Sequence, residues 1–369
     1  VQTGTCPGQI QTSPLRLIVM ARCVFIIQGE GKGHMSQSMA MAEYLEDAGH
    51  QVEAAYVGCS DRVQVPGYFK AFFGDRMHCM SSPYLLRSPN RKGILVGKTI
   101  LFNFTRSVTY LSEIRRIRRA VNSMRPDVVF NFYDLVGALA LRRLDPKIRR
   151  IGIGHQFFLH MEKYPCDEGP ALHRWLLRIF TGLVMRSCDR VLALSFRETR
   201  GKGKIEVVPP LIRKKFREIS YRPGDRYLAY LLTEGYVYEL VTLARADPDF
   251  RADVFTDLTP EMEVPPGLQL HSPDEANFTE KMASCRGLIT TSGFDAVAEA
   301  AYLGLPMVVI PVRNHFEQLC NSLDTERSGF GLRTMKLVPG IETKMRPYDN
   351  RTYRRWVDTV GKRIFKMIE

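Results

Sequence analysis

The chain has 369 residues, of which 45% are apolar, 25% charged and 10% aromatic. This composition is typical of globular proteins and excludes global disorder, collagen-like repeats and low complexity. The length is enough for about two domains of ordinary size. The best apolar run, residues 15–27, is interrupted by Arg16 and Arg22 and falls short of the roughly 18 residues that span a bilayer. The sequence therefore argues against an integral membrane protein.

The beginning of the chain and its cysteines bear on the compartment. Residues 1–14 are polar and contain glycine and proline, unlike a secretory signal, and we expect residues 1–20 to be a disordered or non-native tail. The eight cysteines include no CxxC or CxxH pair. A long chain without a signal is typical of a cytoplasmic protein with reduced thiols. We accordingly expect a cytoplasmic protein with no metal site and no cofactor.

The net charge of +13 comes from the first part of the chain. Residues 21–215 hold 32 Lys and Arg against 17 Asp and Glu, whereas residues 216–369 hold 19 against 22. This asymmetry favours an anionic partner, either an anionic membrane surface or nucleic acid. The alternative is a solvated surface that only keeps the protein soluble. No helix-turn-helix, RNP-type or zinc-finger signature is present, so we expect no nucleic-acid partner.

The first predicted elements form a strand–loop–helix–strand unit. A short apolar run at 23–28 predicts a buried strand, and the glycine-rich loop 29–33 (GEGKG) follows it. Apolar residues at helical spacing then predict a helix that ends at Gly49, and the next strand is expected at 52–57. Such a unit begins a doubly wound α/β domain. Further strands are expected at 128–130, 151–153, 191–195 and 205–208.

A second α/β series begins after Pro209 and Pro210, with a strand at 227–232. We therefore predict an N-terminal domain at 21–210 and a second domain at 222–335. Residues 336–369 contain apolar side chains at helical spacing, and we expect this segment to pack back across the junction between the domains.

The stretch 288–329 carries the strongest functional pattern. A strand is expected to end just before Ser292, where a helix begins whose first N–H groups can hold a diphosphate. Gly293 leaves room for a ligand to approach the backbone. Glu299 lies two turns along the helix and could accept hydrogen bonds from a ribose diol. The alternative, which can hold at the same time, is that Ser292 and Asp295 form a capping box.

The whole spacing resembles the donor-nucleotide half of GT-B glycosyltransferases. The likeness is greatest to the lipid-linked N-acetylglucosaminyl transferase of peptidoglycan synthesis and to diacylglycerol glycosyltransferases. The residues that carry it are Ser292, Gly293, Glu299, Gly304, Pro306, Pro311, Glu317, Gln318 and Asn321. The resemblance implies that the Ser-Gly turn, with Phe294, holds the donor diphosphate and that Glu299 holds the ribose. It implies that the helix start at His315, Glu317 and Gln318 recognises the sugar.

The N-terminal half supports this resemblance. The loop at Gly29, Gly31 and Gly33, followed by His34, resembles the family's Gly-Gly-x-Gly-Gly-His loop, although Glu30 departs from its small residues. The resemblance places acceptor-site loops at 131–137, which contains Asp134, and at His155 and Gln156. It implies a GT-B fold, in which two Rossmann-like domains face each other across a cleft. The Rossmann dinucleotide pattern and the P-loop pattern are both absent.

His34 has a chemical role that follows from its position. It opens a helix directly after Gly33, and the positive end of a helix disfavours imidazolium. A neutral imidazole in a cleft is a suitable general base for an acceptor hydroxyl. The alternatives are that Asp134 is the base or that His34 only bonds its own loop.

Together these patterns predict an inverting hexosyltransferase (EC 2.4) that uses a nucleotide sugar, with UDP as the expected nucleotide, and a lipid or glycolipid acceptor. Two alternatives stay open, a UDP-sugar 2-epimerase-like enzyme and a degenerate GT-B subunit that only binds a partner. We expect the protein to be peripheral on the inner face of the membrane.

Two segments are candidates for membrane contact, although each could instead be buried against the sheet. On the helix predicted at 171–187 an apolar stripe is expected at Leu172, Leu176, Ile179, Phe180 and Leu183. In the irregular stretch 62–110 the apolar residues expected to be exposed are Tyr68, Phe69, Phe72, Phe73, Leu85, Leu86, Ile94, Leu95, Phe102 and Phe104.

Overall fold

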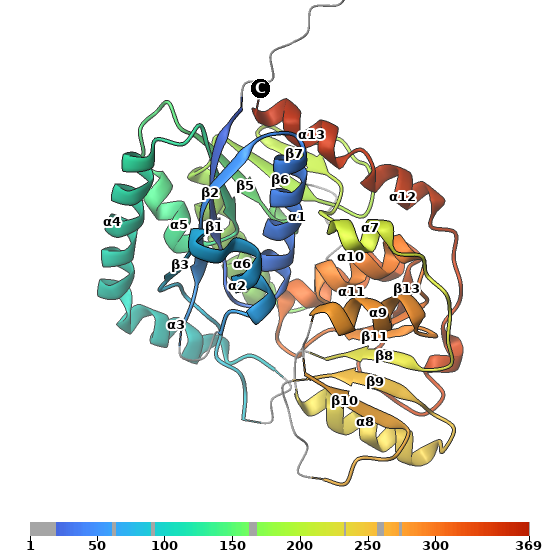
Figure 1. Cartoon of the computed structure of the whole chain (residues 1–369). Coiled ribbons are helices and arrows are strands. Elements are labelled where there is room, and N and C mark those ends of the chain that lie inside the picture. The colour runs from blue at the N-terminus through green and yellow to red at the C-terminus, as the bar shows by residue number, and fades with distance from the viewer. Residues whose placement is uncertain are drawn as a thin grey trace, which may run out of the picture.

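The computed structural model describes residues 20–60, 64–89, 93–161, 168–231, 234–256, 262–272 and 275–368. In this part of the chain two parallel β-sheets follow one another along the sequence, each covered by helices on both faces (Figure 1). The doubly wound α/β architecture expected from the sequence is therefore confirmed.

The first sheet has the strand order β3-β2-β1-β4-β5-β6-β7. Its strands are β1 (Arg22–Ile27), β2 (Gln51–Gly58), β3 (Met77–Met80), β4 (Val128–Phe132), β5 (Arg149–Ile153), β6 (Arg190–Leu194) and β7 (Ile205–Val208). All neighbouring strands run parallel. The central strand β1 is almost wholly buried, because helices cover both faces of a parallel sheet.

Helices on the two faces of this sheet belong to two separate apolar clusters. Phe25 of β1 packs with α1 (Gly33–Asp47) and α2 (Gly67–Phe73), whereas Val24 and Ile26 pack with the opposite layer. That layer contains α4 (Ser107–Met124), α5 (Leu135–Leu141) and α6 (Ala171–Arg186), and α3 (Val96–Thr105) leads into α4. Two short 3-10 helices lie at Gly74–Arg76 and His155–His160.

The second sheet has the order β10-β9-β8-β11-β12-β13. Its strands are β8 (Tyr227–Tyr230), β9 (Ala252–Phe255), β10 (Leu268–His271), β11 (Leu288–Thr291), β12 (Met307–Ile310) and β13 (Gly331–Arg333). Its helices are α8 (Glu234–Ala246), α9 (Glu275–Ser284), α10 (Phe294–Leu303) and α11 (Phe316–Arg327), and α7 (Lys214–Glu218) lies between the two sheets in the chain. A 3-10 turn at Glu342–Lys344 follows β13.

The last helices, α12 (Arg351–Val357) and α13 (Val360–Ile368), return from the second domain to the first (Figure 1). Tyr353 Oη donates to Ala298 O at 3.2 Å, in α10. Trp356 Nε1 donates to Ser195 O at 2.9 Å, just after β6. The end of α13 reaches β5, where Arg149 Nη1 donates to Met367 O at 3.3 Å. The C-terminal segment therefore contacts both domains.

Two expectations need correction. The expectation that all thiols are reduced is wrong, because Cys59 and Cys79 form a disulfide with their Cα atoms 5.5 Å apart. The parallel register of β2 and β3 sets Val57 opposite Cys79, which brings the cysteine two residues further along within reach. The expected exposure of 62–110 is also largely wrong. Phe69, Phe73 and Ile94 are buried, and of the residues named for that segment Phe104 alone is fully exposed.

In the described residues no helix is both long and apolar enough to cross a membrane. The expected tail lies almost entirely in residues 1–19, outside the described residues.

Candidate active site

The two sheets turn the carboxyl ends of their strands toward one cavity. In each sheet the strand order reverses once, between β1 and β4 and between β8 and β11. Strand ends at such a reversal form a crevice that commonly holds ligands. Residues of both domains line a cavity of about 220 Å³ there, including 30–34 from the β1–α1 turn and 293–296 from the β11–α10 turn. The structure therefore brings together the two glycine-containing turns identified in the sequence.

The glycines of the β1–α1 turn are required by close packing. A Cβ atom on Gly29 would lie 1.7 Å from the carbonyl oxygen of Gly58, at the end of β2. A Cβ on Gly33 would lie 2.4 Å from Oδ2 of Asp295, in the second domain. Gly31 has a φ of +74°, which disfavours any side chain. The loop thus passes so close to β2 and to α10 that side chains at positions 29 and 33 would clash, whereas at Gly31 the backbone conformation alone favours glycine.

His34 is the second residue of α1 and lines the cavity. Burial lowers its pKa from 6.5 to about 4, so the imidazole is neutral at pH 7. The neutrality expected from the sequence is found, but the larger cause is burial rather than the helix end. The ring stacks on Tyr133 with centroids 5.8 Å apart. Tyr133 has the uncommon φ of 59° directly after β4, which places its ring against the histidine.

A polar relay across the two domains orients His34. Asp295 Oδ2 accepts a hydrogen bond from Gln37 Nε2 at 3.1 Å. This fixes the amide so that Gln37 Oε1 faces His34 Nδ1, 3.4 Å away. An amide oxygen can only accept, so the contact favours the tautomer with the proton on Nδ1. The lone pair is then on Nε2, where a base needs it.

The β11–α10 turn differs from the expected capping box. Helix α10 begins at Phe294 with Gly293 as its N-cap, and no side chain caps it. Ser292 Oγ instead donates to Gln318 O at 2.7 Å, and Asp295 is engaged by Gln37. Burial raises the pKa of Asp295 to about 6. The start of α10 therefore lines the cavity with no side-chain cap on its first turn.

Glu299 lines the cavity but is paired with an arginine that no pattern in the chain places there. Arg213, which precedes α7 in the segment between the sheets, donates from Nε at 2.9 Å and from Nη2 at 2.6 Å to Glu299 Oε1. Both side chains are buried. A ribose that reaches Glu299 would therefore share the carboxylate with Arg213.

The start of α11 contributes the opposite wall. His315 is its N-cap and accepts from Gln318 N at 3.4 Å, and Gln318 Oε1 accepts from Val312 N at 3.0 Å. Glu317 Oε1 lies 3.3 Å from Nε2 of His155, across the cleft. Burial acts to raise the pKa of Glu317, but His155 and the neighbouring histidines outweigh it and hold the pKa well below its usual range.

Two of the predicted acceptor-side residues do not line the cavity. Asp134 is buried and caps α5, accepting from Gly137 N at 2.6 Å with Oδ1 and from Ser82 Oγ with Oδ2. Burial raises its pKa to about 6. Gln156 is also buried and lies outside the cavity lining, whereas His155 is part of it.

Several lining residues were missed by the sequence patterns, which mark Glu30 only as a departure from a family pattern. Glu30 is half-buried in the cavity wall, where Oε2 accepts from Leu85 N at 2.8 Å. Desolvation of the carboxyl group raises its pKa to about 7. An aromatic wall comes from the second domain, where Phe278 lies 5.1 Å from Tyr230 and 5.2 Å from Phe255 between ring centroids. No local motif marks these three rings.

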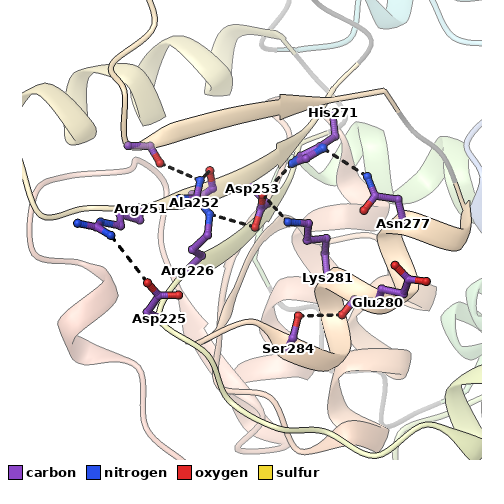
Figure 2. Close-up of polar contacts among 11 residues, drawn as sticks. Asp225, Arg226, Arg251, Ala252, Asp253, His271, Asn277, Glu280, Lys281 and Ser284 are labelled. Carbon is purple, nitrogen blue, oxygen red and sulfur yellow. Dashed lines mark hydrogen bonds and ion pairs between the residues drawn. The ribbon is translucent and has the colours of Figure 1, made fainter.

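The buried carboxylate of Asp253 is the centre of a polar cluster in the second domain (Figure 2). Asp253 of β9 lies 2.7 Å from His271 Nε2, 3.1 Å from Lys281 Nζ and 3.2 Å from Arg226 Nε. Burial acts to raise the pKa of Asp253, but the hydrogen bonds from His271 and Lys281 outweigh it, so the pKa is lowered. His271 stacks on Phe255 with centroids 5.0 Å apart. The cluster therefore ties β9, β10 and α9 together, and His271 connects it to Phe255 of the aromatic wall.

Three solved glycosyltransferases are similar to this chain in fold. The kitacinnamycin glycotransferase is 17% identical, with a TM-score of 0.58 over 95% of this chain and 100% of its own. The spinosyn forosaminyltransferase SpnP is 13% identical, with a TM-score of 0.62 over the same shares. LpCGTa, solved in complex with UDP, is 15% identical with a TM-score of 0.54 over 93% of this chain and 91% of its own. At these identities the likeness defines the fold, and the predicted GT-B fold is confirmed.

The family is shown by the sequence comparison. The model of glycosyl transferase family 1 matches residues 21–340, and the chain belongs to that family. An uncharacterized glycosyltransferase of Methanosarcina acetivorans is 26% identical over 348 residues, 86% of this chain and 84% of the relative. A second, from Methanosarcina mazei, is 24% identical over 341 residues, 84% of each chain. The protein is a glycosyltransferase, as the sequence predicted.

Proposed function

We propose that the protein moves a hexosyl group from a nucleotide sugar, with UDP as the first candidate nucleotide, to a hydroxyl of a lipid or lipid-linked acceptor. We propose inversion at the anomeric carbon and no participation of a metal. The observation that carries the proposal is His34, a neutral imidazole held in one tautomer in the cavity between the domains, beside the uncapped start of α10.

The donor side is the second domain. The first N–H groups of α10 would bind the diphosphate, because the start of a helix carries partial positive charge. Glu299 would accept hydrogen bonds from the ribose. The aromatic wall of Tyr230, Phe255 and Phe278 suits a planar base, since base–aromatic stacking contributes about 1–3 kcal/mol. Relatives of this fold solved with UDP and with thymidine diphosphate support a nucleoside diphosphate as the leaving group.

The reaction is a single displacement. The acceptor oxygen attacks the anomeric carbon as its proton passes to Nε2 of His34, and the bond from that carbon to the diphosphate oxygen breaks. The released nucleoside diphosphate carries the bonding electrons, and the α10 start stabilises its charge. One displacement inverts the anomeric centre. His34 is preferred to Asp134 as the base because both Asp134 carboxylate oxygens already accept hydrogen bonds away from the cavity.

The acceptor side has an apolar component. Tyr68, Leu85 and Ile94 of the first domain line the same cavity as His34. Such a wall suits an acceptor whose hydroxyl is attached to an apolar chain. Glu317 and Gln318 stand where they could bind sugar hydroxyls.

A panel of nucleotide sugars, assayed with a total membrane lipid extract, tests the proposal. The expected result is release of UDP that depends on both donor and lipid, unchanged by EDTA, with a product of opposite anomeric configuration by NMR. Retention of configuration or loss of turnover in EDTA would contradict the mechanism. Interconversion of the donor sugar without acceptor would indicate an epimerase instead.

A further inference from the structure

Helices α3, α4 and α6 expose large apolar side chains. The fractional exposure is 66% for Leu101, 74% for Phe104 and 78% for Val108. On α6, Leu172 is 61% and Trp175 58% exposed. The set, called here the apolar tip, consists of Ile100, Leu101, Phe104, Val108, Leu111, Leu172, Trp175 and Ile179. Single exposed apolar residues need no explanation, but a clustered set indicates an interaction surface.

The two stripes of the apolar tip face the same side of the molecule. Helices α4, α5 and α6 belong to one layer on the first sheet. On α4 the buried Ile114 and Ile117 face the sheet, so Val108 and Leu111 lie on the outer side at helical spacing. On α6 the buried residues are Thr181 and Val184, which turns the Leu172, Trp175 and Ile179 stripe outward as well.

The apolar tip also lies at the cavity end of these helices. A helix that connects parallel strands runs antiparallel to them, so its first turns lie at the carboxyl ends of the strands. The exposed apolar residues occupy α3 and the first turns of α4 and α6, at the end of the sheet that borders the cavity. The link to the cavity is direct, since Leu85 and Ile94 line it and Leu86 N donates to Thr99 Oγ1 of α3 at 2.9 Å.

Basic side chains continue the same outer surface further along the helices. Arg115 and Arg119 are exposed and follow Val108 and Leu111 at helical spacing on α4. The exposed basic residues of the three helices and of the segment after α5 are Lys98, Arg115, Arg116, Arg119, Arg142, Arg143, Lys147, Arg178 and Arg186. Of these, Arg116 is paired with Glu113.

We propose that the apolar tip inserts into the interface of an anionic lipid bilayer and that the basic residues behind it contact the lipid headgroups. Aromatic and aliphatic side chains next to Lys and Arg characterise helices that lie in a membrane interface. A protein partner would favour a surface depleted of charge around the apolar centre, whereas here arginines continue the stripe. Membrane contact through this surface would bring the cavity to the lipid acceptor, and in this respect the proposal rests on the proposed function.

Vesicle flotation tests the surface without any turnover. Wild-type protein is mixed at low salt with vesicles of phosphatidylglycerol and phosphatidylethanolamine, and separately with pure phosphatidylcholine. The first test variant carries Phe104→Ser and Val108→Ser, with Met335→Ser and Val338→Ser as its matched control, because those two residues are exposed apolar side chains of the second domain. The second carries Arg115→Gln and Arg119→Gln, matched by Arg355→Gln and Lys362→Gln.

The wild type is expected to float with anionic vesicles and to dissociate in high salt. Loss of two arginines should weaken binding about thirtyfold, since each contributes about 1 kcal/mol near an anionic surface. Loss of the two apolar side chains should weaken it roughly tenfold or more. Both control variants should bind like the wild type. Absence of wild-type binding, equal binding to neutral vesicles, or binding unaffected by the test variants would overturn the proposal.

Two further readouts separate the possible failures. Light scattering reports whether Phe104→Ser with Val108→Ser abolishes self-association, in which case the apolar tip is a protein interface and the bilayer proposal fails. Turnover with a detergent-solubilised acceptor should be the same for wild type and variants. If the protein binds anionic vesicles through this surface but transfers no sugar to lipid, the lipid acceptor is wrong and the membrane contact stands.

Discussion

The β1–α1 turn and the β11–α10 turn line the same cavity from opposite domains, but their glycines serve different purposes. In the first turn, Cβ atoms on Gly29 and Gly33 would clash with atoms of β2 and of α10. In the second, a Cβ on Gly293 would have its nearest neighbour, Thr291 O, 3.9 Å away. The first turn is therefore constrained by the fold, whereas the second leaves open space toward the cavity. The difference agrees with the proposed roles, in which the first turn positions His34 and the second binds the donor diphosphate.

The largest expected effect concerns the side chain that the first turn positions. His34→Ala should lower turnover about 10²–10⁴-fold, the usual contribution of general acid–base catalysis, with little change in affinity for UDP. Single-turnover kinetics and calorimetry measure the two quantities. A large loss of UDP affinity with near-normal turnover would show that His34 binds the donor and does not act as the base for the acceptor hydroxyl.

The next effect concerns the helix that follows the second turn. Glu299→Ala should weaken donor binding about tenfold or more, because a charge-assisted hydrogen bond contributes about 1.5–3 kcal/mol. It should also lower the free energy of unfolding by about 3–5 kcal/mol, because Arg213 loses its buried partner. Combining Arg213→Met with Glu299→Leu is the control. Denaturant unfolding should show stability restored toward the wild type, while calorimetry should still show weak UDP binding.

The two glycines provide the direct comparison. Gly29→Ala should lower the free energy of unfolding by about 1–3 kcal/mol or more, because its methyl group overlaps the backbone of Gly58. Gly293→Ala should leave it within about 0.5 kcal/mol and should instead weaken UDP binding, since the methyl group enters the cavity. If Gly293→Ala were the more destabilising of the two variants, packing would constrain the second turn more than the first, and the comparison drawn here would be wrong.

The smallest effect is a displacement of the pH profile by the relay that joins the turns. The pKa of His34 is lowered to about 4 by burial, so kcat/KM should fall only as the pH approaches 4. Gln37→Glu would place a carboxylate beside Nδ1, which favours imidazolium and raises the pKa of His34. The acid limb should therefore move to higher pH. An acid limb near pH 6 in both proteins would point to Asp295 or Asp134, whose pKa values are raised to about 6.

The parts of the fold that local patterns encode were predictable. The apolar run of β1 and its glycine loop predict a strand, a turn and a helix, and so does the Ser-Gly pair after β11. Residues of both turns line the cavity. Local patterns could not reveal which distant groups meet. Ser292 could have capped its own helix, but its hydroxyl bonds Gln318 O instead.

The same limit applies across the domain junction. Arg213 and Glu299 are separated by 86 residues, and Gln37 and Asp295 by 258. Their pairing depends on how the two domains pack, which leaves no periodicity or spacing in the chain. The exposed apolar stripe on α6 was only partly predicted, for a related reason. Helical spacing identified Leu172 and Ile179, but Phe180 turns inward to pack on Tyr133, with centroids 5.3 Å apart.

The return of α12 and α13 to the first domain has a mechanical consequence. The two domains are joined by two separate lengths of chain, the segment from β7 to β8 and the segment that leads from β13 to α12, and Trp356 anchors the second of these to Ser195. A domain joined to another by one segment of chain can rotate about any axis through that segment. With two connecting segments, the main rotation left is the one about the line that joins them. If the cavity opens, we therefore expect one principal rotation between the domains, which would separate Asp295 from Gln37 and break the hydrogen bond between them.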